Sequence, residues 1–260
     1  MDITGILVII LVVLLLYVLV KYAMSGSQVK TGIESALTQH TIKAESLTTS
    51  SAGASNFSHC IWFTVQDWNY NYGVYKPLLV RAPGSAGASD LVPGLSAKNV
   101  CPAVILGSQN NNMEVWQTIM DDGNPVTPGS STQVIDNIRY HKCTVTNVPI
   151  QKWCFFVVSF YGRTCDLYLD GKLIKTCVMD GIAKVDKDSD MFVTPGIQTG
   201  KGSFQGYTSN YTFIPRSINP QEAYDLYKKG FGGNWLTNLL NMQVTVTLSK
   251  NGQVQKEYTL

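Results

Sequence analysis

Three aspartates have the spacing that comes closest to a metal site in this sequence. Asp186, Asp188 and Asp190 alternate along the chain, as the first ligands of a calcium-binding loop do. However, Lys187 stands among them, and the twelfth position, which needs a bidentate glutamate, holds Ile197. We therefore expect exposed acidic loops and no bound metal ion. The candidate ligands for any ion are Asp121, Asp122, Asp186, Asp188 and Asp190.

The sequence lacks the residue spacings that nucleophilic catalysis and thiol chemistry usually require. The sequence contains no Gly-x-Ser-x-Gly, the motif that exposes a nucleophilic serine in many hydrolases. The histidines His40, His59 and His141 are scattered, and no two cysteines have the C-x-x-C spacing of a zinc or redox site. We therefore predict a protein that is not an enzyme and holds no cofactor.

The six cysteines could form three disulfides. They are Cys60, Cys101, Cys143, Cys154, Cys165 and Cys177. If the domain faces the cytosol, their thiols should be mostly reduced. The pair Asp170-Gly171 suits a two-residue hairpin turn, and counting back from it sets Cys165 opposite Thr176. On that register the sulfurs of Cys165 and Cys177 point to different faces, so we predict no bridge between them.

Tryptophan side chains could form a platform on which a sugar stacks. Trp62 and Trp153 lie within apolar runs, where packing in a core is expected. Trp68 lies instead in a stretch rich in tyrosine and asparagine, residues 67–73. The residues predicted to contact a ligand or a partner protein are therefore Trp68, Tyr70 and Tyr72.

Charge makes nucleic acid an unsuitable partner. The chain has 20 basic and 18 acidic residues, a net charge of +2, and no basic cluster or arginine-rich stripe. Charged residues make up 15% of the sequence, while glycine, asparagine, serine and threonine are plentiful. This balance favours short strands and many turns over long surface helices.

One apolar segment, residues 3–20, is long enough to cross a bilayer. As a helix it would reach roughly 27 Å. We predict an uncleaved lipid-bound anchor, in preference to a secretory signal cleaved near residues 23–25 or a buried core helix. Lysines follow the segment, which favours a cytosolic C-terminal domain. The residues that mark the anchor and its polar end are Ile3, Tyr17, Val20, Lys21 and Tyr22.

The rest of the chain predicts one β-rich domain. Runs of β-branched and aromatic residues alternate with turn signals, most clearly in residues 153–179, which form a three-strand meander. Asn219 and Pro220 open a short helix that Gly230 closes. We predict an all-β antiparallel sandwich or jelly roll with one short C-terminal helix. The predicted division is an anchor at 1–23, a linker at 24–39, the sandwich at 40–230 and an extension with a β-hairpin at 231–260.

Four segments together resemble the concanavalin A-like, laminin-G-like jelly roll. They are residues 57–65, 153–160, 167–172 and 206–230. Residues 67–73 look like versions of this domain in large double-stranded DNA viruses, several of which are membrane-tethered virion proteins. The resemblance implies a fold more firmly than a function, because this sandwich serves lectins, glycanases, adhesion modules and capsid parts.

A glycanase is disfavoured by the acidic residues. Retaining glycanases of this fold carry a Glu-x-Asp-x-x-Glu strand, which holds two carboxylates about 5 Å apart. This chain has five glutamates and none in that arrangement, since Glu114 is followed by Val-Trp-Gln-Thr-Ile-Met.

Two functional hypotheses remain. The leading one is a non-enzymatic minor capsid or virion membrane component that links the internal membrane to the capsid shell through other capsid or membrane proteins. The rival is a membrane-tethered, lectin-like adhesin that binds glycans and has bridged cysteines. Six free thiols favour the first hypothesis and three bridges favour the second.

Overall fold

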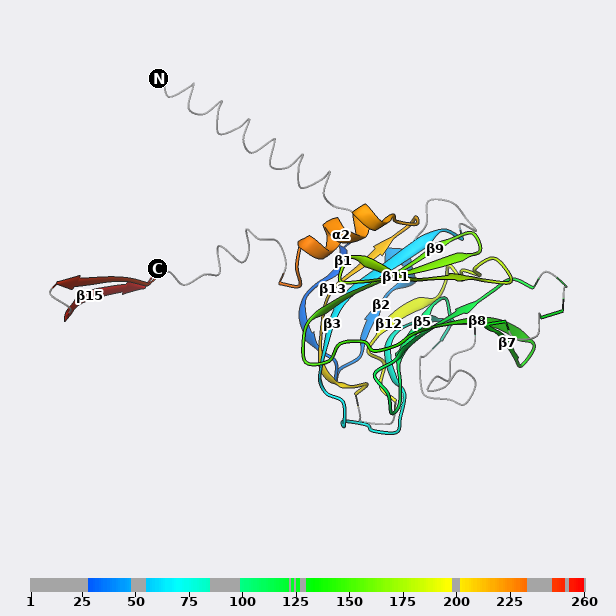
Figure 1. The fold of residues 1–260 in the computed structure, drawn as a ribbon, viewed down its shortest axis with the longest axis horizontal. Helices are drawn as coiled ribbons and strands as arrows, with labels where there is room; N and C mark the ends of the chain where they lie inside the picture. Colours follow the sequence, from blue (N-terminus) through cyan, green and yellow to red (C-terminus); the bar gives the residue numbers. More distant parts are fainter. Residues whose placement is uncertain are drawn as a thin grey trace, which may run out of the picture.

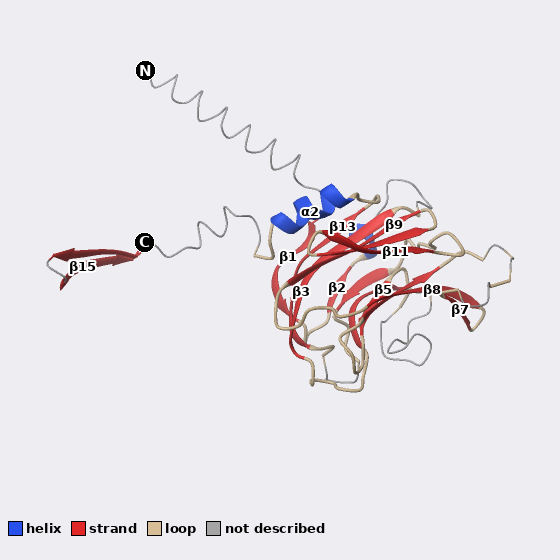
Figure 2. Cartoon of the chain, viewed as in Figure 1, coloured by secondary structure: helices blue, strands red, loops and turns tan. Residues whose placement is uncertain are grey.

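The computed structural model describes residues 28–47, 55–84, 99–121, 123, 125–126, 130–197, 202–232, 245–250 and 253–259. In these ranges the chain forms two antiparallel sheets packed face to face, a short helix and a separate hairpin (Figure 1, Figure 2). The predicted all-β sandwich with one short C-terminal helix is therefore confirmed.

Both sheets mix strands from distant parts of the chain. Sheet A has the order β1 (Gln28–Ser35), β13 (Gln205–Ile214), β3 (Phe57–Asp67), β9 (Cys154–Tyr161), β10 (Thr164–Leu169), β11 (Lys172–Val178). Sheet B has the order β2 (His40–Ile42), β12 (Asp190–Val193), β4 (Lys76–Ala82), β5 (Ala103–Leu106), β6 (Met113–Thr118), β8 (Ile138–Val145), β7 (Thr132–Ile135). The remaining elements are the 3-10 helix η1 (Ala44–Leu47), helix α2 (Pro220–Lys228) and the hairpin of β14 (Thr245–Lys250) with β15 (Gln253–Thr259).

The alternation along β3 explains the layers. Phe57, Ile61 and Phe63 point between the sheets and join the main apolar core. Cys60 and Trp62, on the opposite face, join a smaller apolar cluster beneath α2. Because successive strand residues face opposite sides, one strand serves both layers, which is why β3 reads as a continuous apolar run.

Helix α2 begins and ends at the residues that the sequence indicates. The side chain of Asn219 accepts a hydrogen bond from the N–H of Glu222, and the side chain of Glu222 accepts one from the N–H of Asn219. This reciprocal capping box satisfies two N–H groups at the N-terminus. Pro220 occupies the first turn, and Gly230 follows the helix with a φ of 76°.

The predicted pairing of β10 with β11 is right only near the turn. Asp170 and Gly171 both have positive φ, 50° and 75°, as the two-residue turn requires. A β-bulge between Leu167 and Tyr168 then shifts the register by one residue. The predicted register is wrong beyond this bulge, because an extra residue on one strand reverses which partner each side chain meets.

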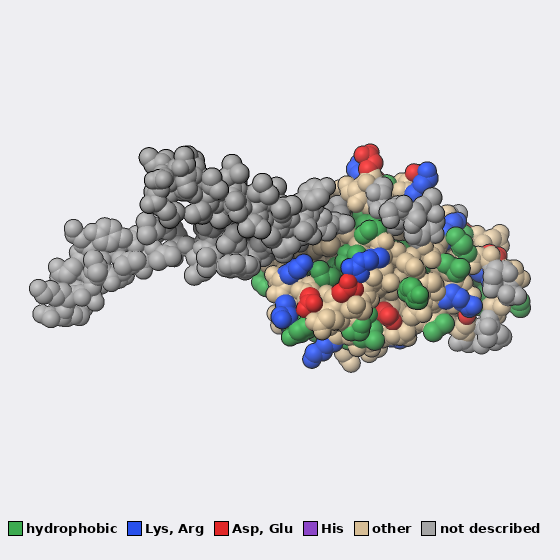
Figure 3. Space-filling view, turned by 90° about the horizontal axis from the view of Figure 1, so that it is seen from above, with side chains coloured by type: hydrophobic (Ala, Val, Ile, Leu, Met, Phe, Trp, Pro, Cys, Tyr) green, Lys and Arg blue, Asp and Glu red, His purple; other side chains and the backbone are tan. Residues whose placement is uncertain are grey.

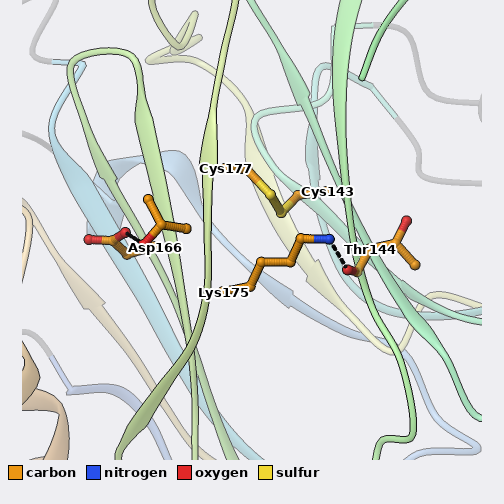
Figure 4. Close-up of a disulfide and its surroundings, with 6 residues drawn as sticks. Cys143, Thr144, Asp166, Lys175 and Cys177 are labelled. Carbon is orange, nitrogen blue, oxygen red and sulfur yellow. Dashed lines mark hydrogen bonds between the residues drawn. A yellow bond between two sulfur atoms is a disulfide. The ribbon is translucent and has the colours of Figure 1, made fainter. Parts of the chain in front are cut away.

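The bulge brings two cysteines opposite each other. Cys165 pairs with Cys177 rather than with Thr176, and both contact the main core, so their sulfurs do not point to different faces. The absence of a Cys165–Cys177 bridge is nevertheless confirmed, because Cys177 is bonded to Cys143 of β8 in sheet B (Figure 4). The other four cysteines are buried free thiols.

The N-terminal predictions fall partly outside the described residues. Residues 28–35, placed in the predicted linker, form β1 and pair with β13 at the edge of sheet A. The predicted anchor at residues 3–20 lies outside the described ranges. Within those ranges, the protein has no helix of the length and apolarity that a membrane crossing requires.

Candidate binding groove on sheet A

The outer face of sheet A is only partly covered. Helix α2 lies along this face (Figure 1) and packs on Trp62 of β3, Phe155 of β9 and Tyr168 of β10. Beside the helix the face opens into a groove of about 540 Å³. Its lining residues are Ile33, Thr64, Gln66, Gln151, Lys152, Trp153 and Tyr207. A concave site of this size is within the range of small-molecule pockets.

Strand pairing positions one side of the groove. Thr64 and Gln66 alternate on β3 with the core residue Val65, and Tyr207 of β13 lies directly opposite Thr64. These three side chains therefore share the outer face of the sheet. The alternation of β3 places polar groups here because α2 does not cover this end of the strand.

The loop before β9 forms the other side. The backbone N–H of Gln151 donates to the carbonyl oxygen of Val65 at 2.7 Å, which ties the loop to β3. Gln151 has a φ of 59°, in the left-handed region that residues other than glycine rarely adopt. Such backbone strain persists where surrounding contacts impose it, and it is commonly found at functional sites.

A chain of aromatic ring contacts packs against Trp153, the residue immediately before β9. The half-buried indole stacks on Phe231, with ring centroids 4.4 Å apart and an interplanar angle of 10°. Phe231 meets Trp62 edge-on at 5.8 Å, and Trp62 stacks on Tyr227 of α2 at 5.5 Å. These contacts hold the indole in one orientation, so a ligand that stacks on it has little side-chain entropy to remove.

The groove has one charged side chain, and that charge is balanced. The Nζ of Lys152 lies 3.0 Å from Oδ2 of Asp170. The other oxygen of Asp170 accepts a hydrogen bond from the N–H of Phe155 at 2.9 Å, which fixes the carboxylate. The hydrogen bond with Asp170 raises the pKa of Lys152, so the amine stays protonated and paired.

The neutral polar groups of the groove are available to a ligand. Gln66 and Gln151 are exposed, and each amide supplies donors and an acceptor. The hydroxyls of Thr64, which is 6% exposed, and of Tyr207, which is 39% exposed, also line the groove. Within the described part of the chain, none of these four side chains makes a hydrogen bond to another residue.

The loop predicted to contact a partner lies outside this lining. The indole N–H of Trp68 donates to the carbonyl of Gln109 at 3.2 Å, and the Nζ of Lys76 lies 4.8 Å above the ring. Tyr70 is half-buried, whereas Tyr72 is 60% exposed. Trp68 is thus largely engaged in internal contacts, and Tyr72 is the ring of this loop that faces solvent.

The predicted calcium ligands do not converge. Asp190 is bound by Lys43 and by the N–H of Ala44, both at 2.9 Å, while Asp186 accepts from the N–H of Asp188 at 3.1 Å. Asp121 pairs with Arg139, and Asp122 lies outside the described residues. No group of three metal-binding side chains occurs among the residues that the structure describes.

Trp153 lines the groove, although its sequence context predicts a position in the core. We expected it in the core because an apolar run follows it, but it is half-buried and lines the groove. The polar pair Gln151-Lys152 immediately before it is the available signal that this end of the apolar run approaches the surface. The apolar run alone could not distinguish the two positions.

Charges on the face that includes α2 are interspersed by sign. Figure 3 shows lysine or arginine side chains beside acidic ones on the visible surface, with apolar side chains between them. A phosphate backbone is bound by a continuous basic surface, which this face lacks over the described residues.

Comparison with known proteins gives partial structural likenesses. No protein-family model and no curated protein matches the sequence. The chain is similar to the receptor binding domain of botulinum neurotoxin mosaic serotype C/D, at 10% identity and a TM-score of 0.49, covering 76% of this chain and 42% of that one. It is also similar to the ligand binding domain of botulinum neurotoxin serotype D in complex with N-acetylneuraminic acid, at 12% identity and a TM-score of 0.47, covering 80% and 44%. The chain thus spans less than half the length of these solved chains.

Proposed function

We propose that this protein is a non-enzymatic carbohydrate-binding protein whose recognition site is the groove on sheet A. The observation that carries the proposal is the combination of a braced indole, Trp153, with neutral amides and hydroxyls that bond to no other residue among those the structure describes. Sugars present C–H groups to an aromatic face and hydroxyls at their rim, and this groove offers a complement to both.

The state of the glutamates supports binding rather than catalysis. Glu114 is 8% exposed, accepts a hydrogen bond from the indole of Trp116 and pairs with Lys142 at 2.8 Å. Glu222 pairs with Arg216 at 2.7 Å and caps α2. A general acid or nucleophile must reach a substrate, and these two carboxylates are committed to internal partners.

The disulfide supports a location in an oxidising compartment. Bridges persist in secreted and lumenal environments and are rare in the cytosol. The Cys143–Cys177 bridge therefore favours the side of the membrane opposite to the one expected from the lysines near the anchor. We accordingly propose a single-pass membrane protein that presents its sandwich away from the cytosol.

A glycan array with the full chain in detergent tests the proposal. We expect reproducible binding to a restricted set of glycans. The Gln66→Ala variant should weaken this binding without lowering Tm, because Gln66 is exposed and its side chain bonds to none of the described residues. If the wild-type chain is folded, as judged by its Tm, and yet binds no glycan, the proposal is ruled out.

A second candidate is a minor capsid component that links an internal viral membrane to its shell. The surfaces that favour it are β11, whose residues are nearly all exposed, and the β14–β15 hairpin, which pairs with neither sheet in the described chain. Exposed edges can add a strand from a neighbour. Detergent extraction of purified particles tests this role. Retention with the shell supports it, and release with lipid opposes it.

A further inference from the structure

We infer that the groove on sheet A accepts a neutral pyranose and discriminates against acidic sugars; the inference rests on the proposed function and names its ligand class. The distinction is decided by charge. A ligand carboxylate or sulfate is bound most strongly by a cation that is free to pair, and the only cation in the lining is Lys152.

Lys152 is already paired with an anion of the protein. Its ammonium is held 3.0 Å from Asp170, whose second oxygen is fixed by the N–H of Phe155. An incoming carboxylate would have to share Lys152 with Asp170 and would lie near that negative charge. Like charges that share one cation repel, so the pair opposes an acidic ligand.

The aromatic wall disfavours an anion for the same reason. The faces of aromatic rings are electron-rich, and they attract positively polarised C–H groups and cations. Trp153 is supported on one face by Phe231, so it meets a ligand as a fixed wall rather than as a mobile side chain. The C–H face of a pyranose fits this wall, whereas a carboxylate against it would be repelled.

Neutral donors and acceptors supply the remaining recognition. The amides of Gln66 and Gln151 each offer donors and an acceptor, which match sugar hydroxyls or an N-acetyl group. Gln151 is fixed by its backbone hydrogen bond to Val65 and by its left-handed conformation. The groove therefore provides one stacking wall and two amides, with no unpaired charge in its lining.

The test compares matched ligands on the full chain in detergent. Neutral oligosaccharides and their sialylated or sulfated counterparts with the same core are titrated calorimetrically. We expect the neutral member of each pair to bind at least tenfold more tightly. Trp153→Ala should weaken binding about tenfold, and Gln151→Ala about threefold to tenfold, the loss expected for one hydrogen bond. Lys152→Gln should change the affinity less than about threefold, because the ammonium serves Asp170.

Controls separate binding from folding. Trp153→Phe keeps a ring on Phe231, so it should retain the wild-type Tm and lose only part of the affinity. Tyr161→Ala removes a ring that is 66% exposed and does not line the groove, and it should leave binding unchanged.

Three results would overturn the inference in different ways. Binding of acidic glycans alone, abolished by Lys152→Gln, would leave carbohydrate binding intact and refute the neutral class. Binding that is lost in Trp68→Ala and kept in Trp153→Ala would move the site to the 67–73 loop. Absence of binding to any glycan by a folded chain would remove the proposed function as well.

Discussion

Cys165 lies directly opposite Cys177 on neighbouring strands, yet the sulfur of Cys177 is bonded to Cys143 in the other sheet. The bridge therefore joins β11, an edge strand of sheet A, to β8 of sheet B. Beside it, the Nζ of Lys175 donates to the carbonyl of Thr144 at 2.7 Å (Figure 4). Two cross-links of different chemistry thus hold the sheets together at this side of the sandwich.

Reduction of the bridge should destabilise the sandwich. Cys143 and Cys177 are 34 residues apart, and a cross-link of that span contributes about 4 kcal/mol by restricting the unfolded chain. We expect a reductant to lower the free energy of unfolding of the wild type by about this amount in denaturant titrations. The Cys143→Ser/Cys177→Ser double variant, which has no bridge to reduce, should unfold at the same denaturant concentration with and without reductant. Equal stability of oxidised and reduced wild type would contradict the assignment.

Without Cys143, the thiol of Cys177 should form a disulfide with a different cysteine. Directly opposed strand residues have Cβ atoms about 4.5 to 5.5 Å apart, close to the separation that a disulfide spans. In Cys143→Ser we therefore expect mild oxidation to join Cys165 to Cys177, detected by peptide mapping under non-reducing conditions. Recovery of both thiols in free form would show that the cross-strand pair is held too far apart.

Acid should destabilise the fold through a buried histidine. The Nδ1 of His59 lies 2.7 Å from the hydroxyl of Tyr211, and burial, helped by the nearby charge of Arg81, holds the pKa of His59 well below 6.5. Below pH 6.5 the unfolded chain therefore binds a proton that the folded chain does not, so stability falls as pH falls. The expected slope is up to about 1.4 kcal/mol per pH unit.

Unfolding titrations between pH 6.5 and 5 measure this slope. His59→Gln should flatten it by about one proton, leaving the smaller contribution of His141, whose pKa burial also lowers. Tyr211→Phe is the matched control, because it removes the hydrogen bond and retains the titrating group. An unchanged slope in His59→Gln would assign the acid sensitivity to other residues.

Gly171 should tolerate a side chain less well than another turn glycine. Both Gly171 and Gly162 have positive φ, 75° and 56°, so alanine costs backbone strain of about 1 kcal/mol at either position. A Cβ on Gly171 would also lie 3.0 Å from the Cα of Tyr224 in α2, whereas Gly162 has open space. We expect Gly171→Ala to lower the free energy of unfolding by about 2 kcal/mol or more, and Gly162→Ala by about half of that. Similar losses in both variants would mean that α2 moves aside at little cost.

Local signals predicted the elements that depend on local chemistry. The Asp170-Gly171 turn requires two positive φ values, and the capping box of Asn219 needs only its own helix turn, so both could be recognised from residue types. The alternation in β3 likewise reflects one strand between two apolar layers. These features are set within a few residues, which is the range over which the sequence pattern is informative.

Features set by tertiary contacts were not predicted. The bulge near Leu167 interrupts the pairing of β10 with β11 without a local sequence signal. Strand β1 forms at an edge from polar residues and Gly32, so it leaves no strong periodic signal either. Trp153 has the same apolar neighbours as a core residue. Its position at the groove follows from where α2 stops covering sheet A, which the local sequence does not encode.

The ring beneath Trp153 belongs to Phe231, one residue past the sandwich boundary predicted at residue 230. A fragment expressed to that boundary would keep every strand of both sheets and α2, yet the indole would lose the surface it rests on. Such a fragment would fold and melt as a sandwich while giving a misleadingly weak result in any ligand screen. Fragments intended for binding studies should therefore extend at least through Gly232.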